Sequence, residues 1–207
     1  MRVIVTSNYS ETGEVAGGMI AKVVHTVNLD EYLGLAPDHP QSYRYFMDTK
    51  LFDHINVPKE NTFVASGVGN ETECVKEFRS ILNRTHVDIQ LLGIGEDGHI
   101  AFNEPGKVLH NNAHIESLTE STIAANARFF ANEDEVPKKA ISMGMGDIMR
   151  ASKIILIATG PKKADAIRGL IMNEDVDVNN PSTMLKMHPD VTVIIDRPLA
   201  DLVGYTD

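Results

Sequence analysis

Short runs of apolar, often β-branched residues alternate along the chain with segments whose apolar residues recur at helical spacing. The strongest run is Lys153–Thr159 (KIILIAT), and Gly160 and Pro161 separate it from a helical pattern that begins near Lys163. A second run, Val87–Ile94, is mostly apolar, as is typical of a strand covered on both faces. Strands that alternate with helices predict an α/β fold with a mainly parallel central sheet.

The remaining elements follow from the same patterns. A capping residue, Asn70, precedes an apolar stripe at Cys74, Phe78, Ile81 and Leu82, which predicts a helix over Glu71–Arg84. No repeat or linker interrupts the chain, so we expect one domain over residues 1–207. The other predicted elements are strands at Val3–Val5, Thr26–Leu29, Thr62–Ala65 and Val191–Ile195, and helices at Glu11–Val24 and Glu120–Phe130.

Composition and charge exclude several classes of partner. The chain has 207 residues and a formal net charge of −10, so it is a poor non-specific ligand for nucleic acid or an anionic membrane surface. Cys74 is the only cysteine, which excludes an intramolecular disulfide and fits a reducing compartment. No apolar stretch approaches the roughly 20 residues of a membrane span. We therefore expect a cytoplasmic protein.

Candidate chemistry follows two of the predicted strands. Ligands of open parallel sheets bind beyond the carboxyl ends of the strands, and Val87–Ile94 is followed there by Gly95–Gly106 (GEDGHIAFNEPG). That loop carries Asp97, His99 and Glu104, and an imidazole flanked by carboxylates suits proton transfer. Asp30 directly follows another predicted strand, Thr26–Leu29, and we expect Asp30 and His99 to face one cleft.

Two other interpretations of these residues stay open at this point. A D-x-H-x4-E pattern alone is common in surface turns, and the acidic pair Asp30 and Glu31 is common in solvated loops. The imidazole and carboxylates can also bind a metal, although the paired-histidine spacing of common zinc sites is missing.

Several longer strings carry a resemblance to a known family. LLGIGEDGHIAFNEPG (Leu91–Gly106) resembles the signature of the glucosamine-6-phosphate deaminases. VNLDEYLGL, HPQSYRYFM, STIAANARFF and VPKKAISMGMGDIM resemble the same family in the same order. The resemblance implies a three-layer, Rossmann-like α/β fold. It also implies an amino-sugar catabolic enzyme that converts glucosamine 6-phosphate and water to fructose 6-phosphate and ammonia, with no cofactor and no metal.

The resemblance assigns catalytic roles to four residues. Asp30 is then the base that moves a proton from C2 to C1 of the open-chain sugar. His99 is the acid and base of ring opening, supported by Asp97 and Glu104.

Three further positions match substrate-binding residues of the family. Arg128 and Lys163 correspond to residues that hold the phosphate, and cationic side chains suit that role. Tyr43 corresponds to a residue of the lid over the site. The partner implied is a small amino-sugar phosphate, with no nucleic acid and no membrane.

The chain departs from the family in one segment. The family has a strand and a GSTP-type loop that binds phosphate through backbone amides, and no counterpart lies between Met19 and Asp30. Either the polypeptide lacks the segment or the printed sequence omits it. A Cα–Cα step between Lys22 and Asn28 well above ~3.8 Å would indicate an omission.

A second departure concerns regulation. Some members are hexamers activated by N-acetylglucosamine 6-phosphate, whereas the stretch Gly106–Leu118 here has Lys107 but no Arg, and Glu116 replaces a Lys. We expect an unregulated monomer or small homo-oligomer. The alternative functions are a hydrolase like 6-phosphogluconolactonase and a sugar-phosphate-binding homologue without turnover.

Overall fold

The computed structural model describes residues 1–20, 25–130 and 132–206, and these residues form an α/β fold. The chain divides into two compact units. Unit 1 comprises Met1–Lys22, His86–Asn111 and Met145–Asp207, and unit 2 comprises Val23–Thr85 and Asn112–Gly144. The single domain predicted over residues 1–207 stays a prediction.

Unit 1 is built on a four-stranded parallel sheet in the order β1-β9-β8-β5. This arrangement confirms the predicted parallel sheet, and the continuous apolar runs of β8 and β9 lie at its centre because both faces of these strands are buried. The strands are β1 (Arg2–Thr6), β5 (Ile89–Leu92), β8 (Lys153–Ala158) and β9 (Val191–Asp196).

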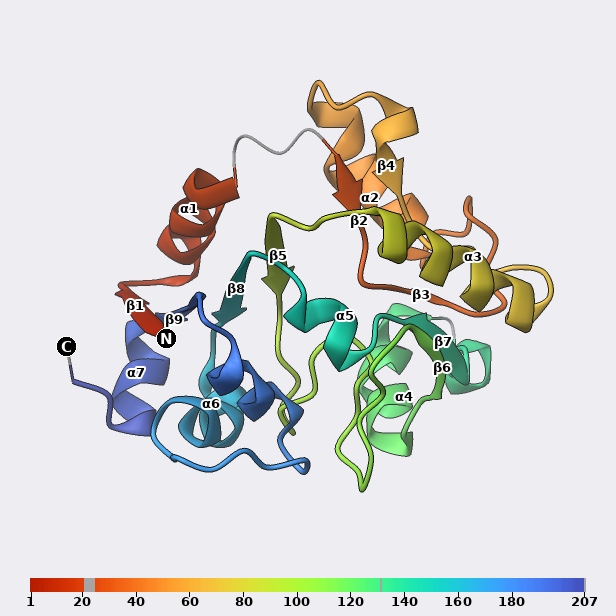
Figure 1. Ribbon diagram of the computed structural model, residues 1–207. Coiled ribbons are helices and arrows are strands. Elements are labelled where there is room, and N and C mark those ends of the chain that lie inside the picture. The colour runs from red at the N-terminus through yellow and green to blue at the C-terminus, as the bar shows by residue number, and fades with distance from the viewer. Residues whose placement is uncertain (21–24, 131, 207) are drawn as a thin grey trace. The chain divides into compact units, whose positions relative to one another are not determined.

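Helices cover both faces of this sheet (Figure 1). Helix α1 (Tyr9–Ile20) packs Ala16 against Ile155 and Ile194 in one buried cluster. Helices α6 (Ala164–Ile171) and α7 (Arg197–Val203) contact each other on the other side. The short helix α5 (Met145–Met149) belongs to the same unit. The layers are therefore those of the three-layer fold expected from the resemblance.

Strand β5 differs from the prediction that both of its faces are covered. Within the described residues it lies at the edge of the sheet and pairs only with β8, and Leu91 is 38% exposed. An edge strand is paired along one side only, so part of its apolar surface meets solvent. Strand β5 is the strand that leads into the loop of Asp97 and His99.

Unit 2 contains two further sheets. Strands β2 (Thr26–Val27) and β4 (Thr62–Phe63) pair in parallel, and β3 (Asp30–Tyr32), β7 (Lys139–Ser142) and β6 (His114–Ser117) form an antiparallel sheet in that order. The sequence patterns did not predict β6 and β7. The helices of this unit are α2 (Tyr43–Lys50), α3 (Glu71–Arg84) and α4 (Glu120–Asn126).

Element boundaries agree with the predictions where local signals are strong. Helix α3 has the predicted bounds, because Asn70 accepts hydrogen bonds from the Thr72 and Glu73 amides and so fixes its start. Helix α4 ends before the predicted Phe130 and continues as a 3-10 turn. The 3-10 helices are η1 (Phe52–His54), η2 (Lys59–Asn61), η3 (Ala127–Phe129), η4 (Glu133–Glu135), η5 (Pro161–Lys163) and η6 (Pro181–Met187).

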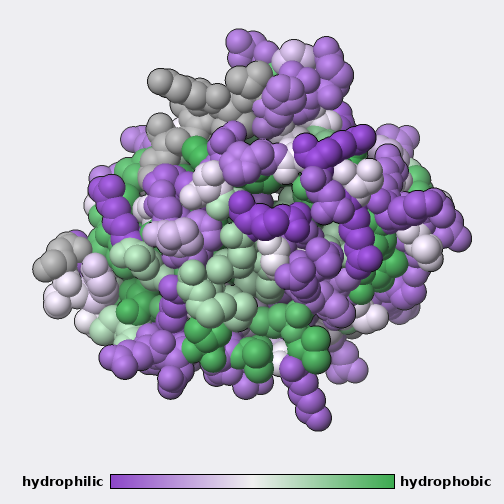
Figure 2. All heavy atoms as spheres, in the orientation of Figure 1, coloured by the Kyte–Doolittle hydropathy of each residue, from purple (hydrophilic) through white to green (hydrophobic). Residues whose placement is uncertain are grey.

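Two predictions fall on residues 21–24, which lie outside the described residues. One is the extension of the first helix to Val24, and the other is the Cα–Cα step between Lys22 and Asn28. Within the described ranges, every helix is too short or too polar to cross a lipid bilayer. Hydrophilic side chains make up much of the face seen in Figure 2, with hydrophobic ones among them.

The cap of α3 yields a test of local stability. Replacing Asn70 by Ala removes the acceptor of two backbone N–H groups, so we expect the free energy of unfolding to fall by about 1 kcal/mol. Urea denaturation followed by circular dichroism measures the change. Asn70→Asp keeps an acceptor and should retain most of the stability, and equal losses in the two variants would contradict the capping role.

Candidate active site

The loop that follows β5 brings Asp97, His99 and Glu104 together in unit 1. Nδ1 of His99 lies 2.8 Å from Oδ1 of Asp97 and 3.5 Å from Oε2 of Glu104. The Glu104 side chain is almost fully buried, whereas His99 and Asp97 keep partial access to solvent. The sequence prediction that these three side chains converge is confirmed by this geometry.

Glycines make this tight loop possible. A Cβ at Gly95 would lie 2.4 Å from the His99 ring and 2.6 Å from the Asp97 carboxylate, so only Gly fits beside the pair. Gly98 has φ of +90°, a conformation that side chains other than that of Gly rarely adopt. Backbone bonds from Gly95 N to His99 O and from Gly98 N to Gly95 O close the turn.

The two carboxylates set the charge of the imidazole. Burial lowers the pKa of His99, but the contacts with Asp97 and Glu104 outweigh it and raise the pKa from 6.5 to about 9. The same contact with His99 lowers the pKa of Asp97. Because the folded pKa of His99 exceeds the unfolded one, its contribution to stability is fully present below about pH 6.5 and is lost as pH rises through about 9.

Lys163 lies in the same unit, at the start of α6. It ends the turn η5 that follows β8, and Gly160 turns the chain there with φ of +86°. The adjacent Lys162 forms an ion pair of 3.3 Å with Glu96, which links this turn to the loop of His99. The predicted phosphate ligand thus lies on a loop tied to the acid–base cluster.

An acidic pocket of about 740 Å³ also belongs to unit 1. Asp97 and Glu96 line it together with Asp165, Asp175 and Asp177. Arg168 lines the same pocket and pairs with Asp165 at 2.7 Å, so a cation of the protein itself already balances part of this negative charge.

Unit 2 positions Asp30 and Tyr43 around one aromatic contact. Asp30 is the first residue of β3 and pairs with Ser142 of β7. The rings of Tyr32 and Tyr43 stack with centroids 5.2 Å apart and planes 13° apart. Burial, followed by the nearby Asp30 carboxylate, raises the pKa of Tyr43 well above its ordinary value. Tyr43 therefore stays a neutral hydroxyl close to Asp30.

Arg128 belongs to the same unit, on η3. Its guanidinium lies 4.7 Å from the centre of the Phe129 ring and the residue is exposed. Two residues further, Phe130 packs edge-on against Tyr32 at 6.3 Å and stacks on His39 at 6.4 Å. The segment that contains Arg128 and the residue Tyr43 therefore both contact the ring of Tyr32, the first of them through Phe130.

The seven predicted site residues therefore fall into two sets. Asp97, His99, Glu104 and Lys163 belong to unit 1, and Asp30, Tyr43 and Arg128 belong to unit 2. The single cleft predicted for Asp30 and His99 stays a prediction. The sequence analysis missed the support of the second set, namely Glu31, Tyr32, His39 and Phe130, because their contacts join residues distant in sequence.

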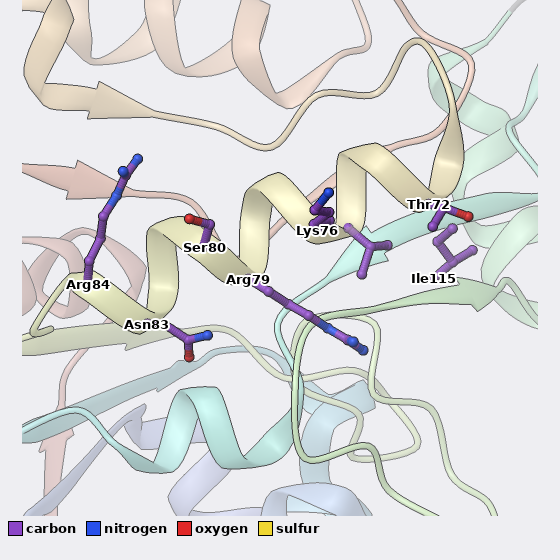
Figure 3. Close-up of a pocket in the computed structure, with 8 residues that line it drawn as sticks. Thr72, Lys76, Arg79, Ser80, Asn83, Arg84 and Ile115 are labelled. Atoms are coloured by element: carbon purple, nitrogen blue, oxygen red, sulfur yellow. The ribbon is translucent and has the colours of Figure 1, made fainter.

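A different pocket, of about 700 Å³, lies along α3 and contains none of the predicted site residues. Lys76, Arg79 and Arg84 project from this helix in Figure 3. Nε of Arg79 donates to the Ala113 carbonyl at 2.7 Å, and Lys76 pairs with the exposed Glu73 at 3.7 Å. Arg79 and Lys76 therefore already have partners within the protein.

Donor atoms of Asp97, His99 and Glu104 all lie within 4.8 Å of one another, so their spacing also suits a divalent cation. Their direct ion pairing offers a second use of the same atoms, in which the imidazole carries the positive charge. The elevated pKa of His99 agrees with that second use.

A family model described as glucosamine-6-phosphate isomerases/6-phosphogluconolactonase matches residues 16–194. The chain belongs to this family. This match confirms the resemblance noted from the sequence strings.

Curated relatives agree with this membership. A glucosamine-6-phosphate deaminase of Thermoanaerobacter pseudethanolicus is 50% identical over 186 residues, which cover 89% of this chain and 73% of the relative. One of Clostridium perfringens is 43% identical over 242 residues, which cover 98% of this chain and 100% of the relative.

Solved structures give the same fold. A monomeric glucosamine-6-phosphate deaminase superposes with a TM-score of 0.93 at 33% identity, covering 98% of this chain and 100% of that one. A 6-phosphogluconolactonase from Trypanosoma cruzi superposes with a TM-score of 0.74 at 17% identity, covering 97% and 96%, and shows the shared fold alone.

The Clostridium alignment also bears on the length of this family member. It extends over 242 residues, whereas the chain has 207, so the relative contains residues without a counterpart here. That these residues include the GSTP-type loop stays a prediction.

The ion pair of Asp97 and His99 predicts a measurable titration. Replacing Asp97 by Asn removes the nearer carboxylate, so we expect the His99 pKa to fall from about 9 toward its ordinary value, by about 1–2 units. Nuclear magnetic resonance of the imidazole protons follows the titration. Glu96→Gln is a matched control, because Glu96 pairs with Lys162, and it should leave the His99 pKa unchanged. An unaltered pKa in Asp97→Asn would contradict the assigned cause.

Proposed function

We propose that this protein is a glucosamine-6-phosphate deaminase, which converts glucosamine 6-phosphate and water to fructose 6-phosphate and ammonia in amino-sugar catabolism. The cluster of His99 between Asp97 and Glu104 carries the proposal. Relatives that bear this name are 43% and 50% identical to the chain. Their high coverage supports transfer of the activity.

The proposed reaction begins with ring opening. The His99 imidazolium donates a proton to the ring oxygen as the C1–O5 bond breaks, and the C1 hydroxyl gives its proton to solvent water, which leaves an aldehyde at C1. Asp97 and Glu104 keep the imidazole oriented and charged. The aldehyde acidifies the C2 proton, which prepares the second step.

In the second step Asp30 removes the C2 proton while O1 takes up a proton from solvent, which gives an enolamine. Asp30 then returns the proton to C1 while the amino group loses a proton to solvent. This isomerisation leaves an imine at C2, and water hydrolyses the imine to a ketone and ammonia. A carboxylate is a sufficient base when it is held close to an activated carbon. The residues alone can supply this chemistry, so the proposal includes neither a cofactor nor a metal.

Arg128 and Lys163 are the proposed phosphate ligands, and Tyr43 is the proposed lid residue over the sugar. Lys163 supports its role by its place at the start of α6, because the N-terminal end of a helix favours anions. We also propose a cytoplasmic location and a monomer or small homo-oligomer without allosteric activation. The solved structure of a monomeric glucosamine-6-phosphate deaminase supports the proposal of a monomer.

Hydrolysis of a sugar lactone, as in the 6-phosphogluconolactonases, fits the acid–base cluster less well. A histidine that acts as the general base for water must be neutral, and a pKa of about 9 keeps His99 mostly charged at pH 7. The charged imidazole instead suits proton donation to a ring oxygen. Asp30 would also have no part in lactone hydrolysis.

Replacing Asp30 by Asn tests the central step. We expect ammonia release from glucosamine 6-phosphate, measured by a coupled assay, to fall by about 100- to 10,000-fold. Binding of the sugar phosphate, measured by calorimetry, should survive because Asp30 acts in proton transfer. Unchanged turnover in this variant would remove Asp30 from the mechanism, and binding without turnover in the wild-type chain would favour the non-catalytic alternative.

The absent GSTP-type segment yields a separate test. Inserting a segment with a GSTP-type loop between Lys22 and Asn28 would add backbone amides for the phosphate, so we expect ammonia release to rise and the KM for glucosamine 6-phosphate to fall by about tenfold or more. An insertion of equal length made of Gly and Ser is the control and should give no such gain. Equal kinetics for the two insertions would defeat this account of phosphate binding.

A further inference from the structure

The buried carboxylate of Glu31 binds three backbone amides. Oε1 accepts from Tyr32 N at 2.8 Å and from Tyr43 N at 2.9 Å, and Oε2 accepts from Arg44 N at 3.0 Å. The residue is 2% exposed. Burial raises the pKa of Glu31, and the three N–H donors oppose that shift. Two of the three bonds join strand β3 to a helix that begins twelve residues later.

These bonds complete the N-terminus of α2. The first N–H groups of a helix have no partner within the helix, and here Glu31 binds those of Tyr43 and Arg44. Ser42 binds the next, because its Oγ accepts from Tyr45 N at 3.0 Å. The negative carboxylate is also favourable at this end of the helix dipole. The start of α2 is thus fixed to β3 by a side chain from outside the helix.

The helix start determines where the Tyr43 ring lies. Tyr43 is the first residue of α2, so its backbone position is set directly by the Glu31 bond. The ring then stacks on Tyr32, which follows Glu31 in β3. Side chains alternate along a strand, so the Glu31 side chain lies on the face of β3 opposite to that of Asp30. It binds the start of α2 from that face.

We propose that Glu31 is a positioning residue, whose carboxylate holds the first amides of α2 and thereby fixes Tyr43 for the substrate. This inference rests on the proposed function for the identity of the substrate. The contact itself rests on the three hydrogen bonds alone.

Replacing Glu31 by Gln tests the proposal with little change in shape. One carboxylate oxygen becomes an NH2 group that faces an N–H donor, so at least one of the three bonds is lost. We expect the KM for glucosamine 6-phosphate to rise by about tenfold with a smaller change in kcat. Hydrogen–deuterium exchange followed by mass spectrometry should show faster exchange in the peptide that contains Tyr43 and Arg44.

Asn70→Ala is the matched control, since it also removes two amide bonds at a helix start in unit 2. It should lower stability and leave the KM unchanged. A Glu31→Gln variant that behaves in the same way would show a structural role only and overturn the proposal.

The pathway through Tyr43 has its own test. In a Tyr43→Ala background, Glu31→Gln should change the KM by less than about twofold, because coupled residues are not additive. A full effect in that background would overturn the proposed action through Tyr43. If the wild-type chain releases no ammonia, the proposed function fails. Exchange at Tyr43 and Arg44 then still decides whether Glu31 holds the helix, and equal rates in wild type and Glu31→Gln would overturn that contact.

Discussion

The contact between His99 and Asp97 is the interaction on which the acid–base chemistry of this chain depends. At 2.8 Å the imidazole and the carboxylate stabilise each other as ions, and the buried Glu104 carboxylate adds to the field. The loop can bring them so close only because Gly95 has no side chain. A backbone constraint thus fixes the distance, and the short distance keeps the imidazole charged, as its proposed role of first proton donor requires.

A buried carboxylate has a different use in unit 2. Glu31 binds neutral amides, whereas Asp97 binds a cation. The low exposure of Glu31 makes those bonds costly to lose, because a buried acceptor without donors retains the full cost of desolvation. Strand β3 therefore carries two adjacent carboxylates with separate tasks. Asp30 is the proposed base, and Glu31 determines the start of the helix that carries Tyr43.

Local patterns could predict those helices and strands whose own residues determine their type and bounds. Helix α3 has both a cap and an apolar stripe, so its bounds follow from its own residues. Strands β8 and β9 are mostly apolar, so their own residues also indicated them. Strands β6 and β7 are four residues long and mix polar with apolar positions. Their pairing depends on strands elsewhere in the chain. The spacing of apolar residues within one segment carries no information about such partners.

The candidate site shows the same limit. Asp97, His99 and Glu104 lie within eight residues of one chain segment, and their convergence could be expected from the turn that contains them. The network of Glu31, Tyr43 and Phe130 joins three separate segments, so its members resembled ordinary buried or aromatic residues. The edge position of β5 was likewise hidden, because an apolar strand has the same composition at an edge as at the centre of a sheet.

The surroundings of His99 differ from those of Asp30, and this difference suits a reaction with two proton transfers. Around His99, two carboxylates keep the imidazole charged, as the proposed proton donation to the ring oxygen requires. Around Asp30, the phenol of Tyr43 stays neutral because burial and the carboxylate itself raise its pKa. A neutral donor can orient a carboxylate without supplying a full positive charge that would weaken it as a base. An imidazole between two carboxylates and a carboxylate near a neutral phenol are different environments, and such a difference can separate the roles of two proton-transfer residues. A charged imidazole is poorly suited as the base of lactone hydrolysis, and Asp30 has no part in that reaction, so the presence of both groups favours the isomerising deaminase.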